Sequence, residues 1–163
     1  MLDYLHRSAE EGWRCPWSRG WPCPWGAARA LWGLAALPGA QRTAAVAGTA
    51  EIALGLLLDQ SRLAAAEFPT AEKPHRVWGR LNFPLFYQAD ILFVLRAAAA
   101  WGALAHPQAQ EALVWLAARR RADGRWRGAN PFRGRTWAAL GDRAETDRWV
   151  SLHAAWVLSQ ASC

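Results

Sequence analysis

Four residues carry the groups from which a catalytic or metal-binding hypothesis can start: Asp90, His153, Cys15 and Cys23. Asp90 begins a long apolar stretch, where it is either the cap of a helix or an acid that faces a ligand. His153 is either a general base or a histidine held in the core or on the surface. Motifs of serine hydrolases, phosphate-binding loops and dinucleotide-binding folds are absent. The catalytic residues are therefore unknown from the sequence, with Asp90 and His153 as the candidates.

The two cysteines lie in a Cys-Pro-Trp triplet that occurs twice, at residues 15–17 and 23–25. Such a pair supplies half of a zinc site if His6 or His153 completes it. Structural zinc sites, however, usually space paired cysteines by about two to four residues, and these two are farther apart. We therefore predict free cysteines packed among tryptophans, with no bound metal and no cofactor.

Apolar periodicity divides the chain into helices. In one of them, Val46, Ala50, Ala53 and Leu57 fall on a single face, which is typical of a helix packed on a core. Prolines and glycines interrupt the helical pattern over residues 13–25, 69–86 and 122–145. The sequence therefore predicts an all-α fold, with helices over residues 2–9, 26–37, 42–58, 87–104, 107–121 and 147–160.

Leucines recur along the chain at nearly constant spacing. Leu31, Leu92 and Leu152 stand 61 and 60 residues apart, and the pairs Leu54/Leu113 and Leu57/Leu116 stand 59 apart. A fixed period of this length indicates repeated structural units, here helical hairpins. In the last helix, Thr146 or Asp147 is the expected cap, and the apolar stripe runs through Trp149, Leu152, Trp156 and Val157.

One stretch carries a recognisable pattern. Trp115-Leu116, Arg120, Gly124 and Trp126 have the spacing of an aromatic-Leu pair, a Gln and a Gly-x-Trp. In this respect the chain resembles the prenyltransferase and squalene-oxidase repeat family, which includes the squalene and hopene cyclases. It departs from that pattern in two places, because Arg120 replaces the Gln and Glu111-Ala112 replaces a basic-Gly start. We expect Arg120 to stack on Trp126 instead, and Trp126 to pack back against the helix before it.

This resemblance implies a ring of inner and outer helices, an α/α toroid. Residues 1–163 then form a single partial toroid domain, with about two whole hairpins and flanking helices. Such an arc leaves apolar surface at the helix over residues 2–9 and at Trp149 and Trp156. The expected partners are a second copy of the chain or missing hairpins of a longer chain.

The family's catalytic acids have no counterpart here, since no two of the six aspartates are adjacent or one residue apart. The expected function is therefore that of a repeat module that binds an apolar small molecule or a protein partner. The alternative is a divergent or truncated enzyme of the terpenoid-cyclase or lyase type.

Charge and hydropathy bear on two further classes of protein, nucleic-acid-binding proteins and membrane proteins. The net charge of +6 suggests nucleic-acid binding, but Lys73 is the only lysine and the rich Arg and Ala content is typical of a GC-rich coding bias. We therefore predict no nucleic-acid partner. The apolar run from Ala89 to Ala105 is broken by Arg96 and is too short for a membrane span. Without an apolar leader at the start of the chain, we expect a soluble, cytoplasmic protein.

Overall fold

A computed structural model of the protein describes residues 1–16, 19–70, 75–136 and 142–161. Lys73 and Cys163 lie outside the described residues. Within them the chain forms six α-helices and no β-strand, and the extended contacts are isolated bridges such as that between Asn82 and Ala129. The predicted all-α fold is confirmed for this part of the chain.

Each predicted helix is present, with shifted ends. The helices are α1 (Leu2–Glu10), α2 (Pro24–Ala35), α3 (Ala44–Leu54), α4 (Ile91–Trp101), α5 (Pro107–Ala117) and α6 (Arg143–Ala161). A π-helical turn, η3 (Gly55–Asp59), extends α3, and short 3-10 turns η2 (Gly39–Gln41) and η4 (Leu63–Ala65) lie in the connections. The arginines at 119–121 therefore follow α5 rather than end it.

Capping side chains explain where the helices begin. The Asp90 carboxylate accepts a hydrogen bond from Phe93 N at 2.7 Å, so α4 begins at Ile91 rather than at residue 87. In the same way, the Asp142 carboxylate accepts from Glu145 N at 2.7 Å. The expected caps of α6, Thr146 and Asp147, are thus wrong, because both residues lie inside the helix.

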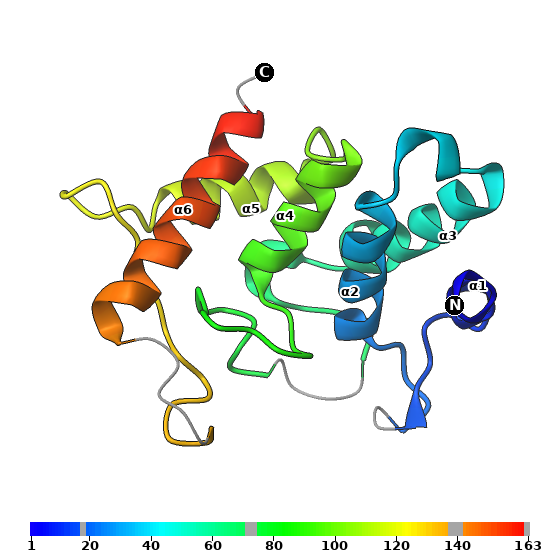
Figure 1. Ribbon diagram of the computed structural model, residues 1–163, viewed down its shortest axis with the longest axis horizontal. Helices are drawn as coiled ribbons and strands as arrows, with labels where there is room; N and C mark the ends of the chain where they lie inside the picture. Colours follow the sequence, from blue (N-terminus) through cyan, green and yellow to red (C-terminus); the bar gives the residue numbers. More distant parts are fainter. Residues whose placement is uncertain (17–18, 71–74, 137–141, 162–163) are drawn as a thin grey trace.

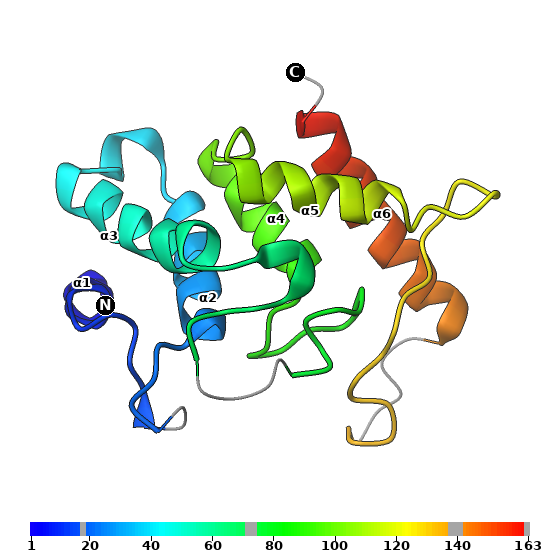
Figure 2. The same cartoon turned by 180° about the vertical axis from the view of Figure 1, so that it is seen from behind.

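The helices form two layers. α6, α4 and α2 stand side by side in one layer, in front of α5 and α3 in Figure 1, and Figure 2 shows the same layers from behind. α1 packs against α3, at the far side from α6. α2, α4 and α6 run in the same direction, and the loops that precede them gather at the lower edge of Figure 1. Side chains at this edge therefore come from three separate parts of the sequence.

The buried faces of α3 and α5 correspond position by position. Their buried residues pair at a constant separation of 63 positions, which is 109 − 46 for the first pair and 116 − 53 for the last: Val46 with Ala109, Thr49 with Ala112, Ala50 with Leu113, and Ala53 with Leu116. The 59-residue leucine spacing therefore does not join equivalent positions. Leu57, for example, lies in η3 beyond the end of α3, whereas Leu116 lies within α5.

α6 buries a different face from the apolar stripe seen in the sequence. Its buried residues are Thr146, Val150, Ala154 and Val157. Trp149, Leu152 and Trp156 are 40%, 58% and 38% exposed. Of the predicted stripe only Val157 is buried, because smaller side chains fit against α4 and α5. The three larger residues form an apolar surface, called here the α6 stripe, at the end of the two layers.

Candidate functional site

The motif at the end of α5 forms a compact turn around Trp126. The indole is 2% exposed, and its Nε1 donates to Leu116 O at 2.8 Å. The Arg120 guanidinium carbon lies 5.5 Å from the indole ring centre, and Arg120 Nε donates to Gly124 O at 3.0 Å. Gly124 has φ +80°, a value that favours glycine. The predicted packing of Trp126 on this helix and its stacking with Arg120 are both confirmed.

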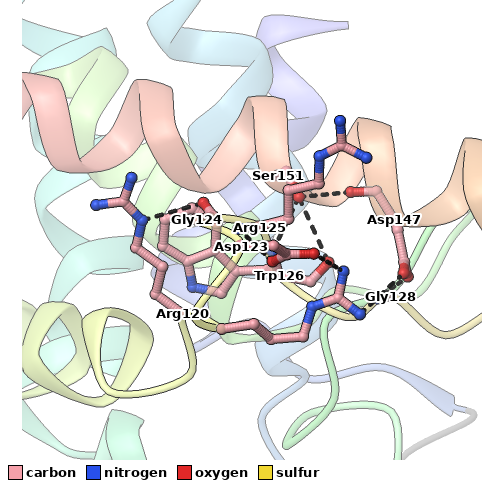
Figure 3. A network of polar contacts seen from close by, with 9 residues as sticks. Arg120, Asp123, Gly124, Arg125, Trp126, Gly128, Asp147 and Ser151 are labelled. Carbon is pink, nitrogen blue, oxygen red and sulfur yellow. Dashed lines mark hydrogen bonds and ion pairs between the residues drawn. The ribbon is translucent and has the colours of Figure 1, made fainter.

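The same turn is tied to α6 (Figure 3). Trp126 N donates to Ser151 Oγ at 2.9 Å, and Gly128 N donates to the Asp147 carboxylate at 2.7 Å. Arg121 contacts the same Asp147 at 3.6 Å. Because these bonds are made by backbone groups and short side chains, they fix the angle between α5 and α6. The motif therefore positions α6 relative to α5.

The two other motif residues have packing roles. Leu116 is fully buried, whereas Trp115 is partly buried and lies at the edge of the core. The Arg119 guanidinium carbon lies 3.8 Å from the centre of the Trp115 ring. Ser151, which the sequence gave no reason to select, proves to be the main partner of the motif.

Asp90 lies within the protein, with its side chain enclosed by donors. One oxygen accepts from Phe93 N, and the other accepts from Asn82 N at 2.8 Å and Asn82 Nδ2 at 2.9 Å. The residue is 1% exposed, and burial raises the pKa of its carboxyl to about 6 despite these bonds. Of the two interpretations, the helix cap is confirmed. Asp90 also holds the loop at Asn82 onto the start of α4.

Two arginines lie close to this carboxylate and are stacked on aromatic rings. The Arg29 guanidinium carbon lies 4.1 Å from the centre of the Phe93 ring, and that of Arg96 lies 4.7 Å from the centre of the Trp32 ring. Arg29 also donates to Gln88 O at 2.6 Å. Burial lowers the pKa of both guanidinium groups, and the charge of Asp90 opposes this shift. α2 and α4 thus share a cationic and aromatic surface that no short motif reveals.

His153 lies on α6 beside the same surface. Its ring centre is 6.0 Å from that of Trp149 and 6.2 Å from that of Phe83, which stacks on Trp149 at 5.2 Å. Burial lowers the pKa of His153 to about 4, and the positive charge of Arg96 adds to the shift. A base with a pKa this low is poorly matched to proton transfer at neutral pH. The charge of Arg96 acts on both Asp90 and His153, but no contact joins these two residues in the described part of the chain.

A further aromatic cluster surrounds Trp25 at the start of α2. The Trp25 ring lies 5.4 Å from His75, 5.8 Å from Tyr87 and 6.1 Å from Trp78, centre to centre. Prolines in residues 69–86 predict a loop there, but no local spacing in the sequence connects this loop to Trp25. The only signal was their high aromatic content, which does not identify the partner.

Of the two cysteines, Cys23 caps the start of α2. Cys23 Sγ accepts from Gly26 N at 3.4 Å, and burial, with the neighbouring Cys15 as a lesser cause, raises the pKa of the Cys23 thiol. His6, one suggested third ligand, contacts Thr49 on α3 instead. The part of the chain that the structure describes contains no cluster of three His, Cys, Asp or Glu side chains suited to a metal ion.

No helix among the described residues is both long enough and apolar enough to cross a lipid bilayer. No protein-family model, curated protein or solved structure matches the chain.

Proposed function

We propose that this chain is a repeat module of the squalene-cyclase and prenyltransferase type, and that the layer of α2, α4 and α6 binds an apolar small molecule. The α6 stripe carries this proposal. It exposes two tryptophans and a leucine, and one of these tryptophans, Trp149, stacks on Phe83 and lies close to the His153 ring. Surfaces of this composition are typical of ligand and partner sites.

The arrangement of the helices supports the proposal that the chain is a repeat module of this type. α2 with α3 and α4 with α5 are successive hairpins, whose first helices make up one layer and whose second helices lie in the other. The matching burial of α3 and α5 is the pattern expected of repeated units. The tie between Trp126 and α6 gives the motif a role in joining one hairpin to the next helix. An arc of an α/α toroid accounts for all three features.

The local shape and charge support an apolar ligand. A hollow of about 460 Å³ lies on α6 between Glu145, Arg148, Trp149 and Leu152. His153 is neutral at pH 7, because its pKa is about 4. Trp149 and Leu152 in this hollow, with the neutral imidazole of His153 nearby, suit the hydrocarbon part of a ligand beside the charged Glu145 and Arg148.

The alternative is a divergent enzyme of the terpenoid-cyclase or lyase type. One observation favours it, namely that the buried carboxyl of Asp90 has a pKa raised to about 6. Its oxygens are bound by Phe93 N and by Asn82, however, and a proton donor must reach its substrate. The binding module is therefore the preferred function.

One experiment tests both functions. The protein is incubated with squalene and, separately, with farnesyl diphosphate, passed through a desalting column, and analysed by mass spectrometry for retained ligand and for products. The proposal predicts that squalene is retained unchanged, and that Trp149→Ser abolishes retention while Tyr4→Ser, on the exposed side of α1, leaves it intact. New products indicate the enzyme. If neither compound is retained, the binding proposal is wrong.

A further inference from the structure

A hollow of about 500 Å³ lies beside the turn that follows α5. Arg80, Arg119 and Arg127 line it, together with small and apolar residues, and none of its lining residues is acidic. We infer that this hollow is a binding site for a small, multiply charged anion whose charged groups are phosphates or carboxylates. This site is distinct from the α6 stripe and does not depend on the function proposed for it.

The walls of the hollow are fixed by hydrogen bonds before any ligand arrives. Ala129 N donates to Leu81 O at 2.7 Å, and Phe83 N donates to Ala129 O at 2.9 Å, so the two loops are joined. Gly128 is pressed onto α6, since a Cβ placed there would lie 2.5 Å from Thr146 Cγ2. A site held in this way loses little conformational freedom when it binds.

Among the described residues, none of the three arginines that line the hollow forms an ion pair with a carboxylate. The arginine ion pairs among the described residues involve Arg62 and Arg121, neither of which lines the hollow. Arg119 is held by its stacking on Trp115 and by a 3.2 Å hydrogen bond from Nη1 to Trp115 O. A guanidinium has five N–H donors, so others remain for a ligand, and their geometry suits phosphate and carboxylate oxygens.

An adjoining hollow indicates that the ligand is small rather than a long polyanion. This second hollow, of about 220 Å³, shares Arg127 and Gly128 and adds Arg133 and Arg143, but Asp142 also lines it. A long polyanion that followed both hollows would have to pass this carboxylate. The first hollow alone falls within the range of about 300–1,000 Å³ that is typical of small-molecule sites. The charges and the volume together favour a small anion over a nucleic acid.

Calorimetric titration at low ionic strength tests the inference, with tripolyphosphate and citrate as the two probes. We expect saturable binding at one site, weakened about tenfold or more by Arg127→Ser and by Arg80→Ser. Arg125→Ser is the matched control, because Arg125 is exposed in the same turn and does not line the hollow. It should change the affinity by less than about twofold. Circular dichroism establishes that all three variants are folded.

The probe that binds with the higher affinity shows whether the site prefers phosphate or carboxylate groups. The inference is supported whichever of tripolyphosphate and citrate binds more tightly. The inference is wrong if neither probe binds saturably, or if Arg125→Ser weakens binding as much as Arg127→Ser does. It is also wrong if a single-stranded 12-nucleotide DNA binds more tightly than both probes and Arg143→Ser removes that binding. This last result would assign both hollows to a nucleic acid.

Discussion

Replacing Trp126 tests whether the α5 turn is an anchor of the fold. Trp126→Ala removes an indole that is 2% exposed, together with its hydrogen bond to Leu116 O. A substitution of this kind in a core costs about 3–5 kcal/mol of unfolding free energy. Trp126→Phe keeps most of the apolar contact and removes only the indole hydrogen bond to Leu116 O, which still accepts from Arg119 N at 3.1 Å. Its expected cost is about 0.5–1.5 kcal/mol. The two losses are therefore expected in that order.

Urea denaturation followed by circular dichroism at 222 nm measures both losses. Tyr4→Ala is the control, because Tyr4 is 67% exposed on α1 and should change stability by less than about 0.5 kcal/mol. Arg120→Ala adds a finer test, since its loss of stacking on Trp126 should cost about 0.5–1 kcal/mol. Our account of the turn fails if Trp126→Ala is no more destabilising than Tyr4→Ala.

Three further predictions concern pH, packing and association. The raised pKa of Asp90 stabilises the fold increasingly as the pH falls from about 6 to 4, whereas the lowered pKa of His153 destabilises it over about 6.5 to 4. Relative to the wild type, Asp90→Asn should therefore lose urea stability on acidification to pH 4, and His153→Gln should gain it; the opposite signs would contradict the assignment. Gly128→Ala should lower the melting temperature, because its Cβ would meet Thr146 at 2.5 Å, and an unchanged midpoint would contradict the close contact. Finally, when no ligand covers the α6 stripe, its exposed apolar side chains should make the protein dimerise in light scattering over a dilution series, and Trp149→Ser should shift it toward monomer. A monomer at every concentration, without binding of an apolar dye, would rule this out.

The periodicity of apolar residues was sufficient to predict the helices and some of the buried residues. Val46, Ala50, Ala53 and Leu57 were predicted to share one face, and all four are buried. The prediction was possible because each of these side chains lies three or four positions from the next along a helix. The motif spacing likewise predicted that Trp126 returns to α5, because the turn between them is short.

Contacts between distant segments could not be predicted. Ser151 accepts from Trp126 N across 25 positions, and Asn82 donates to Asp90 through a loop of irregular shape. On α6, hydrophobicity alone favoured the face with Trp149 and Trp156, yet the smaller Val150 and Ala154 fill the space against α4 and α5. Which face is buried depends on the available volume, and a single sequence does not contain that information in a local pattern.

The common direction of α2, α4 and α6 has an electrostatic consequence. The first turn of each helix carries a partial positive charge of about half a unit, from backbone N–H groups that have no partner within the helix. Asp90 and Asp142 place carboxylates at the starts of α4 and α6, but the start of α2 has the thiol of Cys23, whose pKa is raised. At the edge where the loops before α2, α4 and α6 gather, the electrostatic potential from the helix ends is therefore uneven. It stays positive at the start of α2. A carboxylate in place of Cys23 would remove this imbalance and stabilise α2 by about 0.5–1 kcal/mol.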